Sequence, residues 1–271
     1  MTTILLSDNG STQPNATIKL RQLSGLLSDI IGQTVHPVSL QHANKIPVEK
    51  IGGTKANVFN EFMAEKLSEG NRDYILLPLF FGNSKALTKF VPDEKTRLEE
   101  KYGEFEIQIA KPVYPLPEGD ARLAKILADH VKQSANGLRN IVLVDHGSPV
   151  PRVTAVREHL ANSVQDLLGD EYQVAQACME RREGKEYDFN GQLLEDWLNE
   201  RAVEKSPGAV VAMMFFLPGR HAGEGGDIAE ICQSVMDKNP GFKVSLTPLI
   251  AEHPDFASLL EERYKNLITA S

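Results

Sequence analysis

The sequence predicts an α/β protein of two similar domains in tandem, each a parallel four-stranded sheet flanked by helices. Two observations support this fold class. Strand-length apolar runs alternate with helical patterns, and the pattern of the first half recurs in the second at an offset of 137 residues. The 271 residues suffice for two domains with separate cores. We place these domains at residues 1–136 and 137–271, because Asn136-Gly137 is a natural break.

The repeat is clearest at two strand–turn–helix units. Each begins with an apolar run, turns tightly through a Gly-Ser pair and continues into a helical pattern. The runs begin at Thr3 and Ile141, and six of the 16 positions from residue 8 to residue 23 are identical at the offset of 137. The same offset places Gly82 on Gly219. The identical pairs are Asp8 and Asp145, Gly10 and Gly147, Ser11 and Ser148, Pro14 and Pro151, Thr17 and Thr154, and Leu23 and Leu160.

The remaining elements follow in the same order in both halves. Strands that alternate with helices give βαβ units, a parallel sheet and right-handed crossovers. In the first half we expect, after the opening strand, a helix at 15–31, a strand at 34–40, a helix at 58–67, a strand at 74–81, a further helix, a strand at 106–111 and a helix at 120–133. In the second half the matching segments are 153–168, 172–179, 190–203, 209–217, a further helix, 243–248 and 254–267.

The overall composition excludes several classes of partner. A net charge of -8 and a pI near 5.5 argue against nucleic acid or an anionic membrane. The first residues lack the basic region of a signal peptide, and no apolar run reaches the roughly 18 residues that a membrane helix needs. Cys178 and Cys232 do not have the spacing of a metal-binding pair, which fits a reducing compartment. We therefore expect a cytoplasmic protein.

Polar residues follow three strands of the second half, at the sheet edge where open α/β sheets bind ligands. They are His146, Glu180 and His221. Imidazole and carboxylate ligands suit a divalent first-row metal, and three protein ligands at most would leave positions open for transfer or catalysis. Each residue alone has a structural explanation: a helix cap, a helix-start carboxylate, or a loop histidine bonded to backbone. Their convergence at one edge favours a metal or acid–base site.

Basic residues and glycines surround this edge. The cations would pair with carboxylates of a substrate, although a solvated charged face is the alternative. The glycines allow positive φ and the close approach of a flat ligand. A phosphate-binding loop is the competing explanation, but the chain has neither a Walker pattern nor a dinucleotide fingerprint after the strand. The cations are Arg181, Arg182, Lys185 and Arg220, and the glycines are Gly219, Gly223, Gly225 and Gly226.

The first half lacks this set of ligands. The offset places Asn9 at the position of His146 and Ser84 at that of His221, and Gln41 and His42 stand near the position of Glu180. Asn, Gln and Ser are poor ligands for transition metals, and His42 alone makes no site. We therefore expect a degenerate site in the first half and the active site in the second.

These motifs resemble a known family. The segments that end in His146-Gly-Ser, Met179-Glu180 and Phe215-Phe-Leu-Pro-Gly-Arg-His-Ala222, with the downstream Asp227-Ile, resemble the class II tetrapyrrole chelatases, and the sirohydrochlorin cobaltochelatases and ferrochelatases most of all. The resemblance covers residues 141–248 well and the first half more weakly. Short members carry one domain and pair as homodimers, whereas long members fuse two. The resemblance implies a chelatase-like fold of two α/β domains with the active cleft between them.

The resemblance also implies a function. It indicates a lyase that inserts Co²⁺, or else Fe²⁺ or Ni²⁺, into sirohydrochlorin or a related tetrapyrrole in cobalamin or siroheme biosynthesis, without an organic cofactor. We expect a monomer or a weak homodimer. Carried over by position, the residues that handle the metal are His146, Glu180 and His221, and those that contact the substrate are Ser148, Arg181, Arg182, Gly219 and Arg220.

Two other classes of function are considered. A non-catalytic carrier of metal or tetrapyrrole would have the same fold, and the degenerate first half keeps this alternative open. A hydrolase would use Ser148 as a nucleophile beside His146. Residues that adjoin in sequence do not form a triad, however, and the chain has no nucleophile-elbow pattern.

Overall fold

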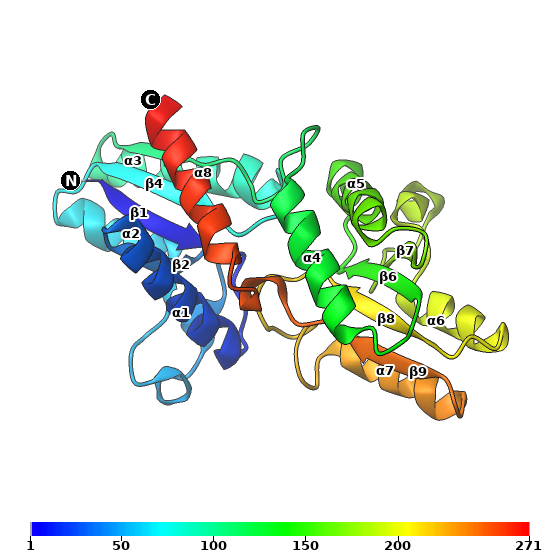
Figure 1. Cartoon of the computed structure of the whole chain (residues 1–271). Coiled ribbons are helices and arrows are strands. Elements are labelled where there is room, and N and C mark those ends of the chain that lie inside the picture. Colours follow the sequence, from blue (N-terminus) through cyan, green and yellow to red (C-terminus); the bar gives the residue numbers. More distant parts are fainter. Residues whose placement is uncertain (1, 271) are drawn as a thin grey trace. The chain divides into compact units, whose positions relative to one another are not determined.

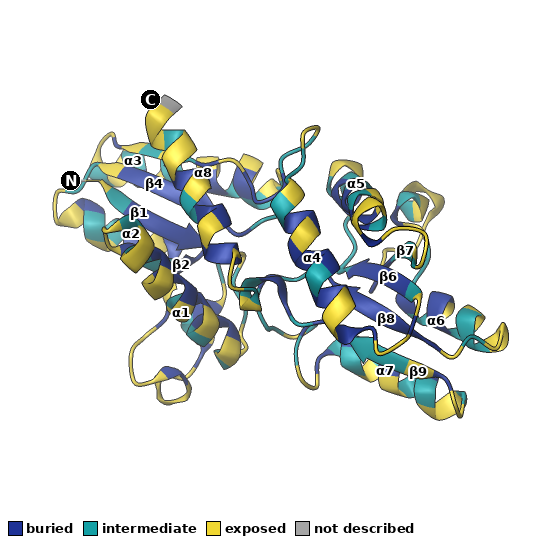
Figure 2. Ribbon diagram, viewed as in Figure 1, coloured by how far each residue is buried: buried dark blue, intermediate teal, exposed yellow. Residues whose placement is uncertain are grey.

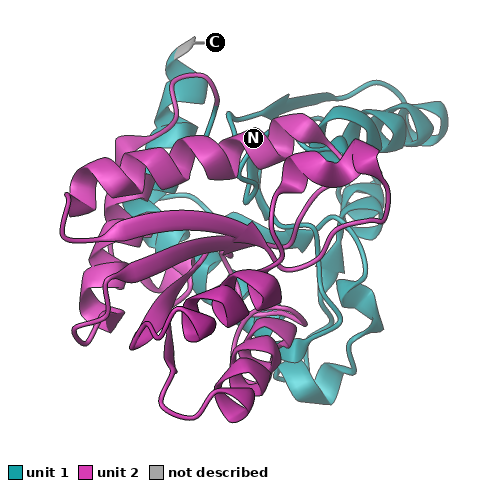
Figure 3. Ribbon diagram, turned by 90° about the vertical axis from the view of Figure 1, so that its right-hand side faces the viewer, with its two compact units in different colours: residues 1–115, 257–271 teal, residues 116–256 magenta. Residues whose placement is uncertain are grey.

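The computed structural model describes residues 2–270 and divides into two compact units. Unit 1 comprises the chain up to Pro115 together with the segment from Ala257 onward, and unit 2 comprises Leu116–Phe256 (Figure 3). Each unit is built around its own parallel sheet. Among the described residues, no helix combines the length and the apolar character needed to cross a membrane.

Unit 1 contains a sheet with the strand order β3-β2-β1-β4-β5 (Figure 1). Four of these strands are the predicted ones. The fifth, β3, adds only two residues at the edge beside β2, too few to produce a periodic pattern in the sequence. The strands are β1 (Thr3–Ser7), β2 (Val35–Ser39), β3 (Asn57–Val58), β4 (Asp73–Pro78) and β5 (Glu106–Ile109). The helices are α1 (Pro14–Ile31), α2 (Phe59–Ser68), α3 (Val91–Tyr102) and α8 (Phe256–Ala270), with short helical turns at Ala43–Lys45, Val48–Ile51 and Ala86–Phe90.

Unit 2 contains the predicted four-stranded parallel sheet, and its strand order is β7-β6-β8-β9. Helices α4 and α5 pack beside each other, and so do α6 and α7. The strands are β6 (Asn140–Asp145), β7 (Gln173–Cys178), β8 (Gly208–Met213) and β9 (Lys243–Leu246). The helices are α4 (Ala121–Ser134), α5 (Pro151–Leu168), α6 (Leu194–Val203) and α7 (Asp227–Lys238), with 3₁₀ turns at Lys185–Asn190, called η4, and at Ile250–Glu252.

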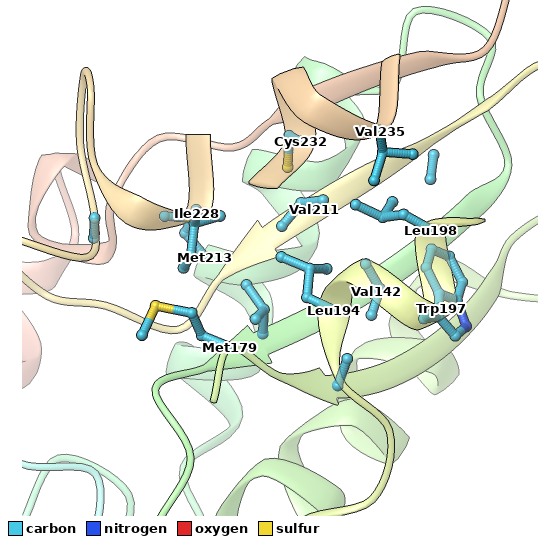
Figure 4. Packing of buried hydrophobic residues seen from close by; sticks show 14 of the residues in the cluster. Val142, Met179, Leu194, Trp197, Leu198, Val211, Met213, Ile228, Cys232 and Val235 are labelled. Carbon is cyan, nitrogen blue, oxygen red and sulfur yellow. The ribbon is translucent and has the colours of Figure 1, made fainter. Parts of the chain in front are cut away.

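The core of unit 2 explains the apolar runs of the sequence. Every residue of β8 is buried, as expected for a central parallel strand with both faces covered (Figure 2). Helix α6 packs Leu194, Trp197 and Leu198 against the sheet, and α7 contributes residues at the same helical spacing (Figure 4). Each fully buried side chain of this size contributes roughly 1.5–3 kcal/mol. The strands predicted between residues 140 and 248 therefore form one sheet, and α6 and α7 pack their apolar side chains against one face of it.

The helix that ends each half of the sequence packs in the compact unit formed mainly by the other half. Helix α4 packs on α5 and β8 in unit 2. Helix α8 belongs to unit 1, where the buried Arg263 donates hydrogen bonds to the carbonyls of Pro112 and Val113. The compact units therefore do not coincide with the predicted domains 1–136 and 137–271. The sequence repeat predicts the order of helices and strands along the chain, but it does not specify the sheet on which a terminal helix packs.

Candidate active site

A tight turn at the carboxyl end of β6 sets the position of His146. Gly147 has φ +93°, and a Cβ there would lie 1.9 Å from the carbonyl oxygen of Glu180. The backbone of the turn therefore passes directly against the segment that follows β7, where Glu180 N–H donates to His146 O over 3.1 Å. Because no side chain fits at residue 147, glycine is what brings His146 and Glu180 together.

The three predicted ligands meet at this edge of the sheet. His146 Nε2 lies 3.2 Å from Glu180 Oε1. The rings of His146 and His221 lie edge to face, with 4.5 Å between their centroids. The side chains of His146 and Glu180 are 44% and 62% exposed, so a ligand can reach them from solvent. The structure thus brings together residues that follow β6, β7 and β8 within one unit.

Asp227, the first residue of α7, fixes the orientation of His221. Its Oδ2 lies 2.7 Å from His221 Nδ1. A carboxylate can only accept, so Nδ1 carries the proton and the Nε2 lone pair is left for a metal or a proton. Asp227 follows the Phe215–Ala222 motif in the sequence, but we predict no role for it from the sequence. An acidic residue six positions after a histidine, at the start of a helix, was the available signal.

The ring of His146 is held from its other side. Its Nδ1 lies 3.2 Å from Gly147 O, and since a carbonyl only accepts, this nitrogen is the donor. In the neutral ring, Nε2 then presents a lone pair toward the Glu180 carboxylate. Two acceptors at this distance bind a cation between them, either a proton or a metal ion.

The side chains of His146, Glu180 and His221 do not form a closed metal cage. Within residues 2–270, no group of three or more His, Cys, Asp or Glu side chains is arranged so that it could hold a metal ion. The three residues instead line up along an open edge. Next to this edge lies a pocket of about 350 Å³, which is lined by His146, Gly147, Ser148, Pro149, Glu180, Arg181 and Arg182.

The predicted substrate-binding residues divide into two groups. Arg181 and Arg182 line the pocket, and both are supported from η4: Arg181 lies 3.4 Å from the Asp188 carboxylate, and the Arg182 guanidinium lies 5.8 Å from the ring centroid of Tyr187. Outside the pocket lining are Arg220, whose side chain is 75% exposed, as well as Lys185 and Gly219.

Ser148 lines the pocket but has a structural role. Its hydroxyl accepts a hydrogen bond from Val150 N–H at the start of α5, over 3.1 Å. Its backbone N–H and C=O both bond to the side chain of Asn190. The ring of His146 bonds to Gly147 and contacts Glu180 and His221, so it does not activate the Ser148 hydroxyl as a nucleophile would require.

Unit 1 repeats the same turn without the ligands. Gly10 also has φ +93°, and a Cβ there would lie 1.7 Å from Gln41 O. Gln41 N–H donates to Asn9 O, as Glu180 N–H donates to His146 O. Asn9 and Gln41 therefore occupy the positions of the histidine and the glutamate, which confirms the correspondence expected for the first strand.

The offset of 137 holds through the helices α1 and α5 that follow this turn, but it fails in the later strands. Ile4 pairs with Val35 and Ile75, and Ile141 pairs with Val174 and Val210, so the offset is 137 for the first strand, 139 for the second and 135 for the third. The predicted matches of Gly82 with Gly219 and of Ser84 with His221 therefore do not follow the strand register. Insertions and deletions in the connections, which one offset cannot represent, explain the difference.

Comparison with known proteins decides the family. Residues 140–267 match the CbiX family model. Over these residues the chain is similar to the CbiX family. The match confirms the resemblance to the class II chelatases. It includes His146, Glu180 and His221. No curated protein matches the chain by sequence.

Solved structures with the CbiX type of fold match nearly the whole chain. SirB from Bacillus subtilis with Fe³⁺ has a TM-score of 0.70 at 16% identity, covering 98% of this chain and 95% of that one. The sirohydrochlorin chelatase SirB from Bacillus subtilis subspecies spizizenii in complex with cobalt has a TM-score of 0.65 at 16% identity, covering 99% and 94%. CbiX, described as the terminal enzyme for biosynthesis of siroheme in denitrifying bacteria, has a TM-score of 0.60 at 13% identity, covering 97% and 98%. The predicted chelatase-like fold is confirmed.

Proposed function

We propose that this protein inserts a divalent metal ion into sirohydrochlorin or a related tetrapyrrole. The observation that carries the proposal is the meeting of His146, Glu180 and His221 at one sheet edge, beside a pocket with two arginines. The match of residues 140–267 to the CbiX family model supports it. The similar structures support it further, since one is described as a sirohydrochlorin chelatase and another as an enzyme of siroheme biosynthesis.

Metal insertion needs groups that accept cations. The ion M²⁺ enters the macrocycle as two pyrrole N–H protons leave, so the charge balances. Since the three side chains form no preformed metal cage, we propose that His146 and His221 present the metal from one face while the ion keeps water or substrate ligands, and that Glu180 assists as a further ligand or as a base. Imidazole suits both tasks because its pKa in water lies near neutrality. Asp227 keeps His221 in the tautomer that offers Nε2.

The pocket suits a substrate rich in carboxylates. Arg181 and Arg182 line it, and a guanidinium binds a carboxylate through two parallel hydrogen bonds. Arg220 is largely exposed and lies 3.6 Å from the Asp227 carboxylate, which places a further cation beside His221 for the periphery of a large macrocycle. These cations favour sirohydrochlorin over a more apolar porphyrin.

We infer that Co²⁺ is the metal, with Fe²⁺ and Ni²⁺ as alternatives that the same donor set accepts. One of the similar structures contains cobalt and another Fe³⁺, so both metals reach sites of this fold. Cobalt would place the reaction in cobalamin biosynthesis, and iron in siroheme biosynthesis. The proposal includes no organic cofactor, and it describes a cytoplasmic protein that acts as a monomer or weak homodimer.

The test is an anaerobic absorbance assay. Sirohydrochlorin is mixed with Co²⁺ or with Fe²⁺, and the rate of the spectral change is compared with and without the protein. The proposal predicts a faster change with protein and turnover beyond one equivalent. Binding of sirohydrochlorin without any rate acceleration, for either metal, would contradict it and favour the alternative of a non-catalytic carrier.

A further inference from the structure

The pocket of unit 2 is held in place by a buried polar network that unit 1 lacks. The network consists of Arg157, Asp145 and Asn190, and the segment that it holds is residues 180–191, here called the rim loop. We propose that Arg157 and Asn190 are positioning residues that fix the rim loop beside the His146 turn, so that substrate binding depends on them. The functional half of this statement rests on the proposed function.

Arg157 lies on α5 and is only 1% exposed. Arginine is almost never this buried unless it is paired, because desolvating its charge costs several kcal/mol. Its guanidinium pairs with the carboxylate of Asp145, the residue before His146. It also donates to Gln176 Oε1 on β7 over 3.1 Å and to the carbonyl of Asn190 over 2.5 Å. One side chain thus joins β6, β7 and the rim loop.

Asn190 completes the connection and is also 1% exposed. Its Oδ1 accepts from Ser148 N–H over 2.9 Å and from the Thr154 hydroxyl over 3.1 Å. Its Nδ2 donates to Ser148 O over 2.8 Å and to Tyr187 O over 3.2 Å. The amide therefore ties the end of the His146 turn to η4, using both its acceptor and its donors.

The rim loop has little else to hold it. From Glu180 to Asn190 the only buried residue is Asn190, and most of the others are exposed. A segment with few buried apolar contacts opens easily unless polar bonds retain it. Glu180, Arg181 and Arg182 lie at its start, on the lining of the pocket. Glu180 is held by its N–H bond to His146 O, and the network fixes the far end of the rim loop, which carries the Asp188 and Tyr187 partners of Arg181 and Arg182.

Unit 1 provides an internal comparison. Its turn has the same glycine conformation, yet Leu20 stands at the position of Arg157 by the offset that relates α1 to α5. Asp8, the counterpart of Asp145, has no arginine partner, and its Oδ1 is buried without a hydrogen bond. The turn therefore folds without the arginine, which indicates that Arg157 serves something other than the turn.

The difference lies in the loop that follows the second strand. In unit 1 this loop has an apolar cluster of its own, formed by Ala43, Ile46, Ile51, Ala56 and Val58. In unit 2 the corresponding loop exposes its side chains, and the buried polar network takes the place of the cluster. The loop of unit 2 therefore depends on buried polar bonds for its position, whereas the loop of unit 1 depends on apolar packing.

The experiment compares Arg157→Leu and Asn190→Ala with a matched control, Val164→Ala. Val164 is fully buried on the same helix, two turns further along, so its truncation destabilises the fold without touching the turn. Hydrogen exchange of residues 180–191 and binding of metal-free sirohydrochlorin are measured for each protein, together with urea unfolding.

We expect faster exchange of the rim loop in both test variants and weaker sirohydrochlorin binding by on the order of tenfold or more, the range for losing partners that orient binding groups. Val164→Ala should match the wild type in both. Exchange and binding in Asn190→Ala or a folded Arg157→Leu that equal those of Val164→Ala would overturn the proposal. If the wild type binds no sirohydrochlorin, the proposed function fails, while the exchange rates still test the network.

Discussion

His146 and Asn9 occupy the same position of the same turn in the two units. In both, the following glycine has φ +93° and lies against the carbonyl of a residue just after the second strand, which is Gln41 in unit 1 and Glu180 in unit 2. The fold therefore does not require an imidazole at this position, since an amide occupies it in unit 1. Because the turn keeps its geometry with either residue, the imidazole of His146 is explained by its chemistry and not by the needs of the fold.

Asp227 offers a test of how His221 is oriented. Its carboxylate accepts the Nδ1–H bond at 2.7 Å, so Asp227→Ala should let the ring rotate and change tautomer. We expect the affinity for Co²⁺, measured by calorimetry, to fall by about 10- to 100-fold. Asp227→Asn should lose less, because an amide oxygen still accepts from Nδ1–H.

The matched control for Asp227 is Glu230→Ala. Glu230 is an exposed acidic residue in the same first turn of α7, so it shares the charge and the helix position but not the contact with His221. Its substitution should leave the affinity for Co²⁺ unchanged. Equal losses in Asp227→Ala and Glu230→Ala would show that the effect is general electrostatics.

At the scale of elements, the strand-to-turn connection decides whether the site forms. Gly147→Ala would place a Cβ 1.9 Å from Glu180 O, in addition to the strain of a positive φ. Gly137→Ala shares the positive φ, but its Cβ meets nothing within 4 Å. We expect Gly137→Ala to lower the free energy of unfolding by about 1 kcal/mol and Gly147→Ala by about 3 kcal/mol or more.

Urea unfolding of the two glycine variants measures this difference. The contrast isolates the backbone clash, since the conformational strain is common to both positions. Similar destabilisation by the two alanines would mean that the turn can widen, and that Glu180 is not held against His146 by the backbone.

The sequence predicts the helices and strands well and the buried polar network not at all. Apolar runs such as 141–144 and the amphipathic spacing of α6 and α7 are local patterns, so they predict β6 and the helices directly. Arg157 and Asn190 are 33 residues apart and polar, and an arginine in a helix normally indicates a solvated face. Neither residue has a periodic signature, and only the fold brings them together.

At the scale of the whole molecule, the two units surround equivalent buried carboxyls differently. Burial raises the pKa of both Asp8 and Asp145, but only Asp145 has an arginine partner. A raised carboxyl pKa stabilises the folded state fully below the unfolded pKa, and this contribution is lost as pH rises toward the folded pKa. Asp8→Asn should therefore become more stable than the wild type as pH rises from about 4 to 7, by on the order of 1–3 kcal/mol.

Asp145→Asn should change stability in the other direction. It removes the charge that pairs with the buried Arg157, and an unpaired buried ion costs about 3–5 kcal/mol. Urea unfolding of both variants between pH 4 and pH 7 checks the pair. Destabilisation by Asp8→Asn at pH 7 would show that this carboxylate has a favourable role that the contacts of unit 1 do not explain.

The central claim is that the His146 edge of unit 2 performs metal insertion. The most direct measurement is the initial rate of Co²⁺ insertion into sirohydrochlorin by His146→Ala, with Asn9→Ala as the control at the same turn of unit 1. We predict that His146→Ala slows the reaction by about a hundredfold or more while its unfolding midpoint stays near that of the wild type, and that Asn9→Ala keeps the wild-type rate. A wild-type rate in His146→Ala would contradict the account.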